Sequence, residues 1–452
     1  MFKSKIDEFK NDEINNLLEI MKFQSVSEET ENYEAPFGEE CKKALEYALN
    51  LGNKIGFRTK NIDGYCGYIE FGEGEEMIGI IGHLDVVPAK KEDGWITEPF
   101  NPQIINNNIY GRGAIDDKGP VMAALYAMKA VSETCKLNKR VRLILGLNEE
   151  KDWKCINHYK LNEEVPTMGF SPDAEFPCIY AEKGIFTAKI QDDLYLGNDV
   201  KILEVNCNNN AVNVVPKYAS IILEYYTEET KNRFMNLENL QIVLLSKNRI
   251  KLEASGVSAH AANPELGDNA ITKLLKALPQ NEFVNKLDNL GFFEIQSPKY
   301  LGGESTIDES GKLTSNIGII ELENNKICLT INYRVPVNTS FDSVKQNMEN
   351  LKNYLPNLNI ELNNANPKLY VSRDSYLVKT LTRIFNEETN FNTEPIAIGG
   401  GTYARAFKNC VAFGAIMPGE KETYHQANEY INIDNLLLAT NIYARAIYEL
   451  GK

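Results

Sequence analysis

The chain has 452 residues, of which 43% are hydrophobic and 25% are charged, and its formal net charge is −15. This length predicts two or three domains, and the composition is typical of soluble globular proteins. The negative charge argues against nonspecific binding to nucleic acid or to an anionic membrane, because both would repel the chain. No stretch approaches the ~20 consecutive apolar residues of a membrane span. We therefore expect neither nucleic acid nor membrane as a partner.

The amino-terminal residues and the cysteines bear on the compartment. Residues 1–21 are charged and amphipathic, without an uninterrupted apolar stretch, so we expect no secretory signal. The eight cysteines are scattered and form no CxxC pair, which argues against a redox motif or a zinc knuckle. Free thiols are typical of a reducing compartment. We therefore expect a cytoplasmic protein.

The first part of the chain alternates between predicted helices and strands. Helical spacing of apolar residues predicts helices over 12–23, 39–57 and 119–135, the last of them opened by Pro120, and a further helix from residue 151. Apolar or alternating runs predict strands over 67–71, 77–82, 140–147 and 167–170. This alternation predicts an α/β domain whose mainly parallel central sheet is flanked by helices.

After about residue 184 the pattern changes. The stretches 219–240 and 325–355 each read as a strand followed by a helix, which predicts two related α+β units. Further elements are expected as helices over 263–278, 281–293, 375–389 and 432–450, and as a strand over 411–417. We expect a catalytic domain of residues 1–184 and 372–452, interrupted by an inserted lid domain of residues 185–371.

Acidic or histidine side chains follow each of three predicted strands, and another precedes a helix. They are His83 and Asp85 after 77–82, Glu149 and Glu150 after 140–147, Asp173 after 167–170, and Asp116 before the helix at 119–135. Each one alone is better explained as a helix cap, a solvated pair or a turn. Open α/β sheets place their sites beyond the carboxyl ends of the strands. Gathering these groups there is costly without a cation between them, so the joint pattern predicts a metal site.

Imidazole and carboxylate ligands without thiolate suit Zn²⁺, Mn²⁺ or Co²⁺. A site for two metals would also need a bridging carboxylate and a second histidine, for which His425 is available. His158 lies on a predicted helix without metal-like neighbours, and we interpret it as a structural or surface residue.

Several motifs occur in the order found in the co-catalytic dizinc exopeptidases, a family that includes aminoacylases, carnosinases, and acetylornithine and succinyl-diaminopimelate hydrolases. These motifs are GHLDVVP, YGRGAIDDKGP, NEE, FSPDAEFP, GVSAHAANPELGDNA, GGGTYAR and YHQANE. The chain resembles this family over nearly its whole length. It is most similar to the bacterial dipeptidases of the PepV type, because SPDAEFP occurs together with GVSAHAANPELGDNA and a long middle segment.

The resemblance implies two divalent metal ions, expected to be Zn²⁺, with Mn²⁺ or Co²⁺ as alternatives. His83 and Asp173 would bind one ion, Glu150 and His425 would bind the other, and Asp116 would bridge both. Two such ions lower the pKa of a water between them and polarise the scissile carbonyl.

The resemblance also implies catalytic groups that do not bind metal. Asp85 would accept the second ring N–H of His83, and Glu149 would be the general base. His260 would donate a hydrogen bond to the oxyanion of the tetrahedral intermediate. Without the flanking motif, His260 would be interpreted as a histidine that caps a turn.

Three residues match family positions that bind the substrate carboxylate, namely Asn213, Arg334 and Arg405. Arginine pairs with carboxylate in bidentate fashion, which suits recognition of the end of a peptide. Arg334 lies on a predicted strand and could instead be a plain surface residue. The run Gly399–Gly401 would allow main-chain N–H groups to approach a carboxylate.

These features predict a cytoplasmic metal-dependent dipeptidase whose partner is a small peptide. The alternatives are a deacylase of N-acyl amino acids within the same family, a catalytically silent relative that binds metal or peptide, and a glycosidase that uses paired carboxylates. Shorter relatives dimerise through a small middle domain, whereas the middle segment of this chain is expected to be doubled. We therefore expect a monomer with a closing lid.

Overall fold

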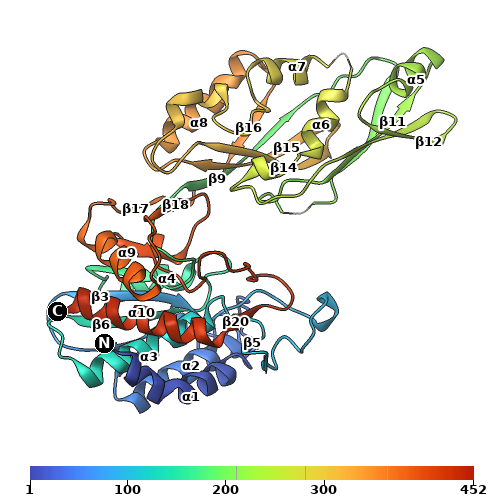
Figure 1. Ribbon diagram of the computed structural model, residues 1–452. Helices are drawn as coiled ribbons and strands as arrows, with labels where there is room; N and C mark the ends of the chain where they lie inside the picture. Colours follow the sequence, from blue (N-terminus) through green and yellow to red (C-terminus); the bar gives the residue numbers. More distant parts are fainter. Residues whose placement is uncertain (210, 280, 364) are drawn as a thin grey trace. The chain divides into compact units, whose positions relative to one another are not determined.

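The computed structural model describes residues 1–209, 211–279, 281–363 and 365–452. These residues form two compact units, and both chain termini lie in unit 1 (Figure 1). Unit 1 comprises Met1–Tyr180, Tyr370–Ile396 and Thr402–Lys452, and unit 2 comprises Ala181–Leu369 and Ala397–Gly401. The observed boundaries lie a few residues before the expected ones, and residues 397–401 belong to unit 2 instead of the domain formed by the chain ends.

The described part of unit 1 is built on a nine-stranded mixed sheet with the order β1-β2-β6-β3-β7-β19-β8-β17, in which β18 also pairs with β8. The strands are β1 (Arg58–Ile62), β2 (Cys66–Phe71), β3 (Met77–His83), β6 (Arg140–Gly146), β7 (Met168–Ser171), β8 (Ile179–Glu182), β17 (Leu369–Tyr370), β18 (Ile396–Ile398) and β19 (Cys410–Ala412). The central strands β6, β3, β7 and β19 are parallel, while β1, β2 and β8 pair antiparallel. The expected α/β class is confirmed, and the parallel part of the sheet is its centre.

Helices pack against this sheet because each presents an apolar face. They are α1 (Lys3–Ile20), α2 (Glu39–Ile55), α3 (Lys118–Thr134), α4 (Lys154–Asn162), α9 (Tyr376–Thr389) and α10 (Ile433–Gly451). Helices α3 and α10 contact β3 and β6, and α1 lies against α3 and α10 (Figure 1). All seven residues of β3 are buried, as its central position requires.

Several elements differ from their predicted bounds. The helix expected over 263–278 begins only at Ala270, and the helix expected over 281–293 ends at Asn289. Helix α1 begins at Lys3 instead of residue 12, because Ile6 and Phe9 extend its buried face. The strand expected over 411–417 ends at Ala412: the N–H of Phe413 still bonds to Ser171 at the end of β7, but the N–H of Ala415 bonds to Ala174 in the loop after β7. No helix in the described residues combines the length and the apolar character that a membrane span needs.

A small sheet of unit 1 joins residues that are distant in the sequence. It has the order β20-β5-β4 and consists of β4 (Gln103–Ile105), β5 (Asn108–Tyr110) and β20 (Tyr430–Asn432). Pairing of β20 with β5 brings the segment before Tyr430 beside the loop that follows Tyr110.

Unit 2 contains two four-stranded antiparallel sheets, with the orders β10-β11-β13-β12 and β14-β15-β9-β16. The strands are β9 (Gly184–Asp192), β10 (Val200–Asn206), β11 (Tyr218–Tyr225), β12 (Gln241–Ser246), β13 (Arg249–Ser255), β14 (Thr314–Glu323), β15 (Lys326–Val335) and β16 (Asn359–Leu362). The helices are α5 (Glu228–Met235), α6 (Ala270–Ala277), α7 (Glu282–Asn289) and α8 (Phe341–Glu349). The two stretches expected to be related appear as β11 followed by α5 and as β15 followed by α8, one in each sheet. Both sheets and the helices contribute to one apolar core.

Glu13 is an isolated carboxyl group inside unit 1. It lies on the buried face of α1, is 0% exposed, and has its Oε1 2.6 Å from the hydroxyl of Thr440. The single hydroxyl hydrogen of Thr440 also lies within reach of the Leu436 carbonyl oxygen, at 2.9 Å. When Thr440 donates to Leu436, Glu13 must be protonated to donate to Thr440. Burial accordingly raises the pKa of Glu13 to about 8.

We predict that Glu13 lowers the stability of the protein as the pH rises. An unfolded chain ionises this carboxyl group above its ordinary pKa, whereas the folded chain keeps it protonated up to about pH 8. Unfolding therefore becomes easier by about 1.4 kcal/mol for each pH unit between these two values. Glu13→Gln should raise the melting temperature at pH 8.5 much more than at pH 5.

The exposed Glu8 of the same helix provides a matched control, and Glu8→Gln should change the melting temperature little at either pH. A Glu13→Gln gain that is the same at pH 5 and pH 8.5 would contradict the protonated state of Glu13.

Candidate metal centre

The candidate residues of unit 1 meet at the carboxyl ends of three neighbouring parallel strands. His83 is the last residue of β3, the pair Glu149–Glu150 follows β6, and Asp173 follows β7. Strand β3 lies between β6 and β7 and is parallel to both. Residues that are far apart in the sequence therefore reach the same edge of the sheet.

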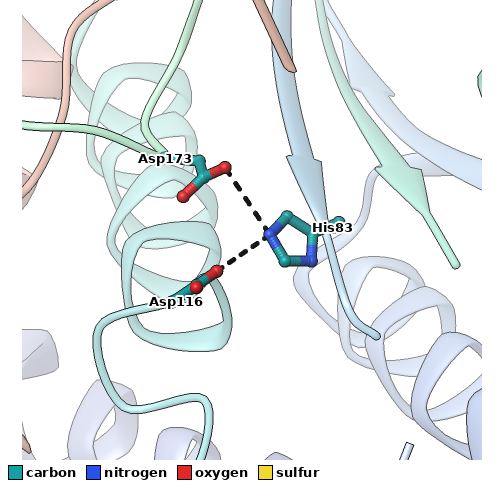
Figure 2. A group of neighbouring side chains, drawn as sticks. All are labelled: His83, Asp116 and Asp173. Carbon is teal, nitrogen blue, oxygen red and sulfur yellow. Dashed lines mark ion pairs between the residues drawn. The ribbon is translucent and has the colours of Figure 1, made fainter. Parts of the chain in front are cut away.

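The first group of side chains surrounds the ring of His83. Its Nε2 lies 3.1 Å from Oδ1 of Asp116 and 3.6 Å from Oδ2 of Asp173 (Figure 2). The ring is fully buried, and within the described residues its Nε2 has no hydrogen-bond partner of acceptable geometry. A buried nitrogen that faces two carboxylates without a hydrogen bond fits a bound cation.

The second group surrounds His425, which lies in the loop between β19 and β20. Its Nε2 lies 2.9 Å from Oδ2 of Asp116 and 3.0 Å from Oε1 of Glu150. The main chain of His425 has a φ of +59°, an uncommon value for a residue other than glycine. Asp116 contributes one carboxylate oxygen to each group, so the five predicted ligands come together as two triplets that share Asp116.

Burial shifts the protonation of these groups. It raises the pKa of the Glu149 carboxyl group well above its ordinary value. It also raises the pKa of Asp173, and the neighbouring Asp116 adds to this rise. Burial alone would lower the pKa of His83, but the nearby carboxylates of Asp116, Asp173 and Asp85 outweigh it and raise that pKa well above its usual range. Cations between the carboxylates would offset the cost of gathering them here.

Asp85 differs from its expected role. Nδ1 of His83 lies 2.9 Å from the main-chain carbonyl oxygen of Asp85 and 3.5 Å from its carboxylate. The ring N–H therefore donates to the carbonyl. The carboxylate instead accepts the main-chain N–H groups of Glu149 and Glu150, each at 3.1 Å, because these half-buried donors of the turn after β6 need acceptors. Asp85 thus holds both the His83 ring and the turn that carries the two glutamates.

Sequence reasoning missed the residue that fixes Asp116. Glu429 is fully buried and accepts the main-chain N–H groups of Ile115 and Asp116, while its other oxygen pairs with Arg112 at 2.5 Å. Burial raises the pKa of Glu429 to about 7, although Arg112 opposes this rise. Both Glu429 and Arg112 lie inside quoted motifs, YHQANE and YGRGAIDDKGP, but their 317-residue separation conceals the contact in the sequence.

The amino-terminal segment after α1 ties two of the site loops together. The hydroxyl of the buried Ser25 donates to the carbonyl of Leu84 at 2.6 Å, and its own carbonyl accepts the N–H of Val86. The side chain of Asn148 donates to the hydroxyl of Ser27 at 3.0 Å. The loop after β3 and the turn after β6 therefore share one buried support.

Three other predicted residues belong to unit 2, namely Asn213, His260 and Arg334, whereas Arg405 belongs to unit 1 and is 8% exposed. Arg334 is 4% exposed, which excludes the alternative of a plain surface residue. Its Nε donates to Oδ1 of Asn332 at 2.7 Å, and one terminal nitrogen donates to the carbonyl of Gly399 at 3.1 Å. This second bond joins Arg334 to the segment 397–401, which likewise belongs to unit 2.

His260 is exposed, and its Nδ1 accepts the main-chain N–H of Ala262 at 3.3 Å. A neutral imidazole that accepts at Nδ1 carries its proton at Nε2. His158 lies on α4 outside both triplets, where it pairs with Asp63 at 2.9 Å and stacks on Tyr65.

We predict that Asp85→Asn weakens metal binding at the triplet that contains Glu150, by about 10–100-fold. The amide group introduced by this change can accept only one of the two main-chain N–H groups that the carboxylate accepts, so the turn that carries Glu150 loses part of its support. The main-chain carbonyl that holds the His83 ring is unchanged. Titration with Zn²⁺, followed by calorimetry, measures both affinities.

The exposed Asp93, whose carboxylate accepts the N–H of Lys90, provides the control substitution Asp93→Asn. If both ions still bind Asp85→Asn with wild-type affinity, Asp85 does not hold the turn that carries Glu150.

Comparisons with known proteins identify the family. Residues 79–449 match the model of Peptidase family M20/M25/M40. A Bacillus subtilis (strain 168) relative named "Putative dipeptidase YtjP" is 39% identical over 98% of both chains. A Staphylococcus epidermidis relative with the same class of name is 36% identical over 100% of this chain and 99% of its own.

Solved structures share the fold. Human carnosine dipeptidase 1 aligns with a TM-score of 0.61 and 15% identity over 100% of this chain and 98% of its own. The dipeptidase Dug1p of Saccharomyces cerevisiae aligns with a TM-score of 0.60 and 14% identity over 99% and 98% of the two chains. The family model spans most of the chain, and it confirms the peptidase resemblance read from the motifs. The chain is an enzyme that belongs to Peptidase family M20/M25/M40.

Proposed function

We propose that this protein is a dipeptidase that hydrolyses the amide bond of dipeptides with the help of two divalent metal ions. The observation that carries this proposal is the sharing of Asp116 between the triplets of His83 and His425. The names of full-length relatives that are 35–39% identical support dipeptides as the substrate class.

The donor atoms of the triplets suit such ions. His83 and Asp173 would hold one ion, Glu150 and His425 the other, and Asp116 would contribute one oxygen to each. Imidazole and carboxylate donors without thiolate suit Zn²⁺, Mn²⁺ or Co²⁺. When bound, two such ions polarise the scissile carbonyl and acidify the attacking water.

Glu149 is the candidate general base. It belongs to neither triplet, but its neighbour Glu150 does, and Asp85 holds the main chain of both. A base must reach the attacking water without binding the cations itself, and this arrangement permits that. Glu149 would accept a proton from the water as the water oxygen attacks the carbonyl carbon. It would then deliver the proton to the amine nitrogen as the C–N bond breaks.

The remaining candidate residues, three from unit 2 and Arg405 from unit 1, suit binding of the substrate and of the oxyanion. The Nε2–H of a neutral His260 is a donor of the kind that stabilises an oxyanion. Asn213, Arg334 and Arg405 would bind the substrate carboxylate, and Asn332 fixes the guanidinium plane of Arg334. The protein would act as a cytoplasmic monomer, consistent with its eight free cysteines.

Glu149→Gln should lower kcat for dipeptide hydrolysis by about 10²–10⁴-fold, because the amide cannot accept the proton of the water. Both ions should remain bound, since Glu149 belongs to neither triplet. Asp152→Asn, an exposed change in the same loop, is the control and should leave kcat unchanged. Wild-type turnover in Glu149→Gln would remove Glu149 from the mechanism.

A substrate panel separates the candidate functions. The protein, loaded with Zn²⁺, Mn²⁺ or Co²⁺, should hydrolyse dipeptides faster than N-acetyl or N-succinyl amino acids. A chelator should abolish the activity, and added metal should restore it. A strong preference for acylated amino acids would favour the deacylase, and activity that resists chelation would contradict the role of the metals.

A further inference from the structure

Asn213 and His260 are held together by a short ladder of main-chain hydrogen bonds within unit 2. Val215 donates to the carbonyl of Ala259 at 2.8 Å, and Ala261 donates to the carbonyl of Asn213 at 2.8 Å. Val214 and His260 lie opposite each other in this ladder. We refer to residues 212–215 and 259–262 as the loop ladder. The side chains of Asn213 and His260 are exposed, and the loop ladder fixes the main chain that carries them.

One buried side chain fixes the loop ladder to β14. Asn316 is 1% exposed, and its Nδ2 donates to the carbonyls of Val212 and Val214, at 3.1 Å and 3.0 Å. The orientation of this amide group is determined, because carbonyl oxygens accept hydrogen bonds and cannot donate them. Asn316 thus holds the carbonyl on each side of Asn213. Its Oδ1 accepts Nδ2 of Asn269, the residue that caps α6.

A glycine on the same strand brings the main chains into contact. A Cβ atom at Gly318 would lie 2.4 Å from the carbonyl oxygen of Val212, a distance that real Cβ atoms do not reach. The Gly318 carbonyl also accepts Nδ2 of Asn209, whose amide lies 3.4 Å from the Val214 carbonyl as well. The loop ladder therefore rests directly on β14.

The same pair of strands also positions the third candidate of unit 2. Asn316 on β14 lies opposite Asn332 on β15, and Asn332 holds Nε of Arg334. The carbonyl of Gly399 accepts a hydrogen bond from Arg334. A Cβ atom added at Gly399 would lie 3.0 Å from Cβ of Ala262, a residue of the loop ladder. Asn213, His260 and Arg334 therefore belong to one connected set of contacts.

We propose that Asn316 is a positioning residue for hydrolysis, which holds Asn213 and His260 in the arrangement that the substrate requires. This inference rests on the proposed function. The side chain acts through the loop ladder and needs no contact with substrate. Its effect depends on the two hydrogens of its side-chain amide, which bond to the carbonyls of Val212 and Val214. A residue without two hydrogen-bond donors at this position cannot make both bonds.

The test compares Asn316→Asp with Asn281→Asp. A carboxylate at residue 316 would face the carbonyls of Val212 and Val214 with no hydrogen to donate. Asn281 is an equally buried asparagine of unit 2, but its Oδ1 caps α7 and its Nδ2 has no partner within the described residues. The change Asn281→Asp keeps the cap. We expect kcat/KM for dipeptides to fall by about 10–100-fold in Asn316→Asp, with both metal ions retained, and to stay at the wild-type value in Asn281→Asp.

A double-mutant cycle separates positioning from a general loss of structure. If Asn316 acts through His260, the change Asn316→Asp should lower kcat/KM much less in a His260→Ala background than in the wild type. Full additivity of the two losses would overturn the proposal. Asn316→Ala, which removes the donors without adding a charge, replaces Asn316→Asp in the cycle if that variant does not fold.

Hydrogen exchange tests the same contacts without any substrate. The amides of Val215 and Ala261 should exchange faster in Asn316→Asp than in Asn281→Asp. Unchanged exchange would overturn the inference even if dipeptides prove to be the substrate. If these amides exchange faster in Asn316→Asp but the protein hydrolyses no dipeptide, the contacts of Asn316 are supported and only the proposed function is contradicted.

Discussion

The two metal triplets depend on one carboxylate, because Asp116 places one oxygen near His83 and the other near His425. The loop that carries Asp116 has no regular structure of its own. Glu429 supplies the acceptor for its main-chain N–H groups and is itself paired with Arg112 inside the protein. A buried ion pair of this kind is costly to break, so it favours a single conformation of the loop.

Both units place their candidate residues by the same physical means, in which a buried polar side chain satisfies main-chain groups of the loop that carries the residue. Asp85 accepts two N–H groups of the turn with Glu149, and Asn316 donates to the two carbonyls that flank Asn213. Loops have few apolar contacts to fix them, so main-chain hydrogen bonds to buried side chains supply the precision that the chemistry needs.

Much of this arrangement could be predicted from the sequence, because it follows from local patterns. The apolar run 77–82 predicts a buried strand that ends at His83, and the motifs identify the family. The supporting contacts could not be predicted, because they join residues that are distant in the chain, such as Arg112 and Glu429. Asp85 was expected to bind the His83 ring through its carboxylate. That carboxylate instead accepts the main-chain N–H groups of Glu149 and Glu150, and no pattern in the sequence reveals these bonds. The bond between Arg334 and Gly399 likewise joins residues that lie far apart in the sequence.

The proposed function requires that two cations share Asp116. Anomalous diffraction at the zinc edge, from crystals grown with Zn²⁺, tests it most directly. Two peaks are expected in unit 1, one among His83, Asp116 and Asp173 and the other among Asp116, Glu150 and His425. A single peak, or two peaks of which only one contacts Asp116, would contradict it.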